Sequence, residues 1–356
     1  MDYLEGPNPV DFWAAKFFHF GWCGVDLFFV LSGFLITGIL YDAKSSAHFL
    51  RNFYARRVLR IFPLYYAVVF FSLVILTHIH HPKAQNFGRI TGDEWWYWLH
   101  LSNLSIARCG LFRHAILDVC WSLSIEEQFY FLWPLLVLLF SRRTLMGIAS
   151  SFIVVAIAVR VYMLMTGWGW ISVSAFTLSR CDGLAAGALL ALAVRGPGGV
   201  RRSLAFMKPI CIASIIALAV AIAWGGSSQE TSKPLLAIGY TALAGIFAAV
   251  ITLGIAAPQG SLLNRFFSCS LLTIFGRLSY ALYLCHISVR AAIRDTVYGP
   301  NKFITIAGSK LPGQMLFSLT SIVASVLVAW LSWHLFEKHF LSLKRFFPAA
   351  KTKTAE

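Results

Sequence analysis

Nine stretches of the sequence stay mainly apolar for about twenty residues, the length that a helix needs to cross the ~30 Å hydrocarbon layer of a membrane. Inside lipid the backbone must satisfy its own hydrogen bonds, so runs of this length are expected to fold as helices. The sequence therefore predicts an all-α, polytopic transmembrane bundle of about nine spans. They occupy residues 21–41, 61–78, 121–140, 145–165, 174–194, 209–225, 234–256, 271–290 and 314–336.

The remaining segments leave no room for an appended soluble domain, so residues 1–356 are expected to form one membrane domain. Residues 1–20 are interpreted as the remnant of an outer loop and residues 337–356 as a cytoplasmic tail. The longest polar connection, 79–120, contains WWYW at 95–98, and such aromatic clusters commonly lie at headgroup depth. We expect an interfacial helix there.

The formal charge of +15 is a marker of topology rather than of nucleic-acid binding in a chain that is 58% hydrophobic and only 13% charged. Loops on the side of the N-terminus carry nine Lys and Arg, whereas loops on the other side carry seventeen. Because basic loops face the cytoplasm, the C-terminus is predicted to be cytoplasmic and the N-terminus external. The seven cysteines form no CxxC pair and no zinc-type spacing, so no metal site is predicted.

Several ionisable or polar residues fall within predicted spans, where a charge is costly and therefore suggests a function. At 1.5 Å per helical residue all of them lie in the outer half of the membrane. They are therefore expected to line a polar chamber that opens to the outside. The set is Asp26, Ser122, Glu126, Glu127, Arg180, Asp182 and His286.

Within WSLSIEEQFY, the residues Ser122, Glu126 and Tyr130 are spaced four apart and share one helical stripe, whereas Glu127 points about 100° away. Glu126 is thus the better chamber residue. It could handle a proton, or it could be a structural partner of Arg180 or of a neighbouring hydroxyl.

The other candidates also keep two interpretations. Asp26 and Asp182 could contribute to the chamber, or each could cap a helix start or hold an arginine. His286 could transfer protons near neutral pH, or it could be a hydrogen-bonded packing residue.

On the cytoplasmic side, Arg56, Arg57 and Arg60 directly precede an apolar span, and Arg56 and Arg60 share a helical face. Guanidinium groups suit phosphate recognition. A basic run at this place is also typical of a topology determinant or of contact with lipid headgroups.

Several ordered segments resemble the acyltransferase 3 group of integral membrane O-acyltransferases, which modify bacterial cell-surface glycans. GVDLFFVLSGFLITGIL (24–40) is the most specific match, followed by WSLSIEEQFYFLWP (121–134). Further segments follow in the order and approximate spacing of the family. They are FYARRVLRIFPLYY (53–66), SRCDGLAAGALLAL (179–192), SYALYLCH (279–286) and FEKHFL (336–341).

The resemblance implies transfer of an acyl group, expected to be acetyl, from acyl-CoA to a hydroxyl of a surface or lipid-linked glycan at the bacterial inner membrane. It makes Arg56, Arg57 and Arg60 candidates for the donor site, and Glu126, His286 and Arg180 candidates for catalysis, with no bound cofactor. The implied partners are acyl-CoA, a glycan or lipid-linked saccharide, and membrane lipids. Asp26, Ser122, Tyr130 and Asp182 are left as chamber or structural residues.

The resemblance also exposes a departure from the family pattern. Family members normally begin with a further span that carries an Arg-x-x-x-His element, whose His is the expected base. This sequence shows no such element before GVDLFF, and His19 cannot be equated with that His. A ten-span form with both termini inside would explain the predicted external N-terminus. The alternatives are an inactive truncated homologue, or a transporter or flippase for lipid-linked sugars.

Overall fold

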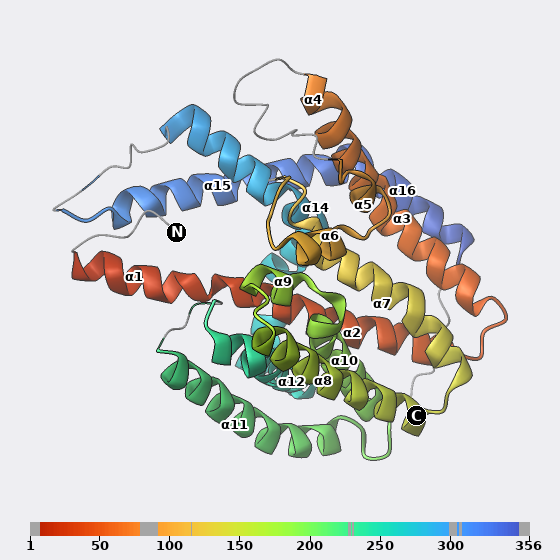
Figure 1. The fold of residues 1–356 in the computed structure, drawn as a ribbon. Helices are drawn as coiled ribbons and strands as arrows, with labels where there is room; N and C mark the ends of the chain where they lie inside the picture. The colour runs from red at the N-terminus through yellow and green to blue at the C-terminus, as the bar shows by residue number, and fades with distance from the viewer. Residues whose placement is uncertain are drawn as a thin grey trace.

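A computed structural model describes residues 8–78, 92–114, 116–226, 229, 231–298, 305 and 308–348, and these residues contain helices but no strand (Figure 1). The predicted all-α bundle is confirmed. Its long helices are α2 (Gly24–Ala43), α3 (Phe49–Phe70), α7 (Cys120–Leu139), α8 (Arg142–Met165), α10 (Thr177–Val194), α11 (Gly199–Gly225), α12 (Tyr240–Ala256), α14 (Ser270–Ile293) and α15 (Leu311–Ser332). The short helices that matter here are α1 (Pro9–His19), α5 (Trp95–Trp98), α6 (Ser102–Cys109), α9 (Trp170–Ala175) and α16 (Lys338–Ser342).

Eight helical stretches within the described residues are long and apolar enough to cross a membrane, compared with the nine spans predicted. All nine predicted segments are helical, but α7 is not among the eight. The polar run Glu126-Glu127-Gln128 lowers the hydropathy of this 20-residue helix. A multi-pass membrane protein results, in which the first half of α7 is mostly buried and the helix packs against α2, α6 and α10.

Three helix boundaries differ from the predicted ones. Residues 9–19, predicted as loop, form α1 and continue through a helical turn into α2. The α3 helix begins at Phe49, so the three candidate donor arginines lie within it. The α11 helix begins ten residues before its apolar run and passes through Pro209. Hydropathy marks only the part of a helix that lies in lipid, so basic and polar extensions are missed.

The α2 and α10 helices form the tightest pair in the bundle. A Cβ atom on Gly33 would lie 2.0 Å from the carbonyl oxygen of Leu184, and one on Gly187 would lie 2.0 Å from that of Val30. Small residues permit this backbone approach in membrane helices. At the far end, Arg195 Nε and Nη2 each lie 2.7 Å from Asp42, which fixes the same parallel register.

The polar segment 92–114 enters the bundle instead of covering it. Tyr65 on α3 donates to the carbonyl oxygen of Tyr97 over 2.7 Å, and the side chain of Tyr97 is almost fully buried. Ser102 and Asn103 of α6 are fully buried as well. The expected interfacial helix is therefore two short helices, α5 and α6. The headgroup depth of the tryptophans stays a prediction.

Candidate active site

Two buried ion pairs stand at the centre of the bundle. Arg180 Nη2 lies 2.9 Å from Asp26 Oδ1, and both side chains are almost completely buried. Arg180 also lies over the ring of Tyr240, with Cζ 3.5 Å from the centroid. For Asp26 and Asp182 the sequence left open a chamber role, a helix cap or an arginine partner, and in the structure each is paired with an arginine. Arg180 forms an ion pair with Asp26, whereas Glu126 contacts the hydroxyl of Tyr130, the other structural partner that the sequence left open.

The second pair was missed in the sequence. Arg160 Nη1 lies 2.9 Å from Asp182 Oδ2, and Arg160 also donates to the carbonyl oxygens of Ala237 and Ser179 and to Thr241. A buried charge that is paired and hydrogen-bonded on all sides is typically structural. The sequence did contain a feature that could have revealed this pair, since Arg160 is a charged residue within a predicted span.

The predicted stripe on α7 is present. Ser122, Glu126 and Tyr130 are all buried, and Tyr130 donates to Glu126 Oε2 over 3.1 Å. Tyr130 forms a further hydrogen bond with Ser32 of α2. The other carboxylate oxygen, Glu126 Oε1, is buried and has no hydrogen-bond partner among the described residues. Glu126 is therefore held by one oxygen, and the other remains available to accept a proton.

A cavity of about 450 Å³ lies beside α14, and His286 is the predicted chamber residue that lines it. We call it the outer cavity after the predicted orientation; its opening to the outside stays a prediction. Tyr283 lines it and hydrogen-bonds with Ser122, which joins the cavity to the α7 stripe. His286 lines the same cavity, and its Nδ1 lies 2.8 Å from the carbonyl oxygen of Tyr283. The position of His286 leaves both predicted interpretations open, proton transfer and a hydrogen-bonded packing role.

Asp118 supplies the acidic side chain of this cavity. Burial raises the pKa of its carboxyl, although the backbone N–H groups of His114 and Arg113 donate to the carboxylate and oppose the shift. Burial also lowers the pKa of the nearby His114. These hydrogen bonds make Asp118 an organiser of the loop that leads into α7.

The three candidate donor arginines lie in three different environments. Arg56 donates to the carbonyl oxygen of Phe347 over 2.9 Å and lines a cavity of about 180 Å³ with Asp42 and Asn52. Arg57 points toward α7, with Cζ 5.4 Å from the ring centroid of Tyr130. Arg60 is exposed. Lys344, which the sequence did not single out, lies near all three arginines and is repelled by their positive charges.

A ring of three hydrogen bonds locks α6, α7 and α10 together beside the stripe. Gln128 donates to Asn103 over 2.9 Å, Asn103 donates to Thr177 over 2.8 Å, and Thr177 donates back to Gln128 over 2.6 Å. Such a closed network orients the polar face of α7. Within the part of the chain that the structure describes, no group of three or more His, Cys, Asp and Glu side chains could hold a metal ion.

Comparison with known proteins adds independent evidence. The chain is 30% identical over 286 residues to the peptidoglycan O-acetyltransferase OatA of Listeria monocytogenes, covering 75% of this chain and 44% of that protein. It is 29% identical over 290 residues to the O-acetyltransferase OatA of Staphylococcus aureus, covering 76% and 46%. The chain spans less than half the length of these relatives, and no solved structure matches it.

The match to a family model covers almost the whole chain. The acyltransferase domain of the acyltransferase 3 family aligns with residues 2–334, which include every candidate site residue described above. The segments that carried the resemblance also meet in space, since the segment 24–40 pairs Asp26 with Arg180 of SRCDG and hydrogen-bonds through Ser32 with Tyr130 of WSLSIEEQFY. The chain therefore belongs to the acyltransferase 3 family of membrane acyltransferases.

Proposed function

We propose that this protein moves an acetyl group from acetyl-CoA, bound at the cytoplasmic end of the bundle, to a hydroxyl of a cell-surface glycan on the outer side. Two of its relatives are named as O-acetyltransferases, which supports acetyl as the group transferred. The basic loops support a cytoplasmic donor site and C-terminus in the bacterial inner membrane. Family membership favours this function over a flippase.

One chain of contacts carries the proposal, because it joins the donor arginines to the α7 stripe. Arg57 lies against the ring of Tyr130, and Tyr130 donates to Glu126. Guanidinium groups recognise phosphates, which suits the CoA part of the donor. An acetyl group reaching inward from Arg57 would approach the free oxygen of Glu126.

Acyl transfer needs a group that accepts the hydroxyl proton and charge that stabilises the thioester oxyanion. The glycan hydroxyl oxygen attacks the thioester carbonyl carbon, so a C–O bond forms and the C–S bond breaks. We assign proton acceptance to Glu126 Oε1 and delivery of this proton to the departing CoA thiolate. Arg57 is assigned to donor binding, and Arg180, held by Asp26, positions α2 and α10.

The donor half is tested by acetyl-CoA binding to the purified full chain in nanodiscs. Arg57→Gln removes the cation beside Tyr130, and we expect binding to weaken at least about tenfold, a change of about 1.4 kcal/mol. Arg51→Gln is the matched control, because Arg51 is an exposed arginine on the same helix. Equal affinity of both variants and the unsubstituted protein would contradict the donor assignment.

A further inference from the structure

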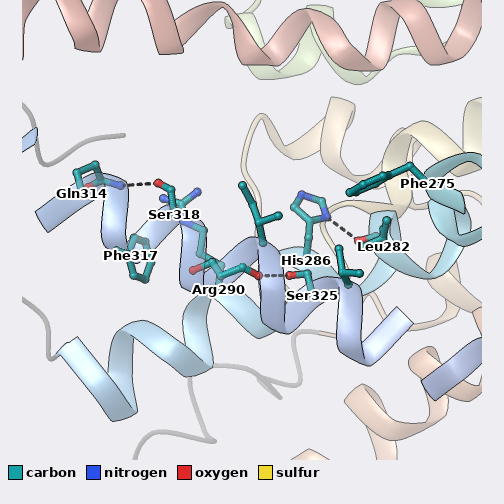
Figure 2. A pocket seen from close by; sticks show the side chains of 11 residues that line it. Phe275, Leu282, His286, Arg290, Gln314, Phe317, Ser318 and Ser325 are labelled. Carbon is teal, nitrogen blue, oxygen red and sulfur yellow. Dashed lines mark hydrogen bonds between the residues drawn. The ribbon is translucent and has the colours of Figure 1, made fainter. Parts of the chain in front are cut away.

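A second cavity, separate from the α7 stripe, runs between α14 and α15 (Figure 2). It has a volume of about 360 Å³. Phe275, Leu282 and Phe317 contribute to its mainly apolar wall. Its lining extends along α14 from Phe275 to Arg290, which at 1.5 Å per residue is about 22 Å. The shape is that of a groove for one extended apolar chain.

The charged side chain of this groove lies toward one end. Arg290 lies near the end of α14 and Gln314 near the start of α15, so both belong to the outward end in the proposed orientation (Figure 2). Arg290 is exposed and forms no ion pair with another described residue. A guanidinium at the mouth of an apolar groove suits an anionic headgroup.

The groove wall also contains buried polar atoms that the protein does not satisfy. Gln314 and Ser321 are both more than nine-tenths buried and line the groove. Gln314 Oε1 and Ser321 Oγ have no hydrogen-bond partner among the described residues. Buried polar groups normally have partners, so these two atoms point to a ligand or to water.

The groove meets the outer cavity at a single side chain. His286 lines both, and the outer cavity continues to Tyr283, which hydrogen-bonds with Ser122 of the stripe. A molecule with its tail in the groove could therefore extend its polar part past His286 toward the side of α7 that carries Glu126.

We infer that the acceptor is a saccharide carried on a lipid phosphate. Its apolar chain lies between α14 and α15, its phosphate contacts Arg290, and its saccharide occupies the outer cavity. The acceptor role rests on the proposed function, whereas the binding site stands on the groove itself. His286 then contacts the linkage between phosphate and saccharide.

The site is tested with a photoactivatable farnesyl-phosphate disaccharide on the full chain in nanodiscs. We expect crosslinks to α14 and α15 that fall at least about tenfold in Ser321→Phe, which fills the groove, and in Arg290→Gln, which removes the cation but leaves the buried wall intact. Val323→Phe, an exposed position on α15, is the matched control and should keep them. Unchanged crosslinking in Arg290→Gln and in folded Ser321→Phe would overturn the proposal.

Two further measurements distinguish failure of the acceptor inference from failure of the proposed function. Photoactivatable phosphatidylglycerol that crosslinks equally well and is not displaced by the farnesyl-phosphate disaccharide would make the groove a membrane-lipid site and overturn the acceptor inference. Acetyl transfer to the lipid-linked disaccharide should fall in Ser321→Phe, while transfer to the same free disaccharide should not; equal losses would also overturn it. Absence of transfer to every acceptor would refute the proposed function, and crosslinking would still decide the binding site.

Discussion

His100 is a buried titratable residue that couples folding to pH. Its ring stacks on Tyr65 with centroids 3.9 Å apart, and neither ring nitrogen has a hydrogen-bond partner among the described residues. Burial lowers its pKa from 6.5 to about 4. The folded protein therefore holds this imidazole neutral at pH values where the unfolded chain protonates it.

The sign and size of the effect follow from proton linkage. Between pH 6.5 and about 4 the unfolded state binds a proton that the folded state does not, so stability falls as the pH falls through this window. Each pH unit corresponds to about 1.4 kcal/mol, so the loss reaches about 2 kcal/mol at pH 5 and about 3 kcal/mol near pH 4. Above pH 6.5 the contribution vanishes.

The assay compares the free energy of unfolding at pH 7 and pH 5 for the unsubstituted protein and His100→Asn, by titration with SDS in mixed micelles. Asparagine tolerates the positive φ of 55° at this position and does not titrate. We expect the loss between the two pH values to be about 2 kcal/mol smaller in the variant. His48→Asn, at an exposed position, is the control. Equal pH dependence of His100→Asn and the unsubstituted protein would refute the reasoning.

Two further substitutions test the packing and the charges around the site. Gly33→Leu places a side chain against backbone at 2.0 Å, so we expect loss of folded protein in size-exclusion chromatography, whereas Gly147→Leu, with open space around it, should elute normally. Asp182→Asn leaves Arg160 buried without its counter-ion and should destabilise the protein by about 3–5 kcal/mol, measured by the same SDS titration. Asp42→Asn, in a more exposed pair, should change stability by about 0–1 kcal/mol, and equal effects would contradict the burial argument.

The membrane fold could be predicted from the sequence, because it depends on hydropathy along one chain. The partners could not. Asp26, Asp182 and Glu126 were all possible partners of Arg180 at similar depth, and the choice depends on the helix faces that meet. That geometry is set by Gly33 and Gly187, whose packing role becomes visible only when α2 and α10 are placed side by side.

The polar segment 92–114 was the other part that sequence patterns could not place. Its composition is typical of an outer loop, and each of its buried groups is unfavourable until a partner is known. Asn103 finds these partners in Gln128 and Thr177, on two other helices. Contacts of this kind join residues far apart in the chain and leave no periodic signal.

Acetyl transfer by Glu126→Gln, with Glu127→Gln beside it, tests the central claim most directly. The assay follows labelled acetyl from acetyl-CoA to the farnesyl-phosphate disaccharide and to the free disaccharide, using the full chain in nanodiscs. Glutamine keeps the shape of Glu126 and its hydrogen bond with Tyr130 but cannot accept the proton. We predict that Glu126→Gln lowers transfer about 10²–10⁴-fold with normal acetyl-CoA binding and folded yield, and that Glu127→Gln lowers it far less. Normal transfer by Glu126→Gln would contradict the account and leave Glu126 as a structural residue.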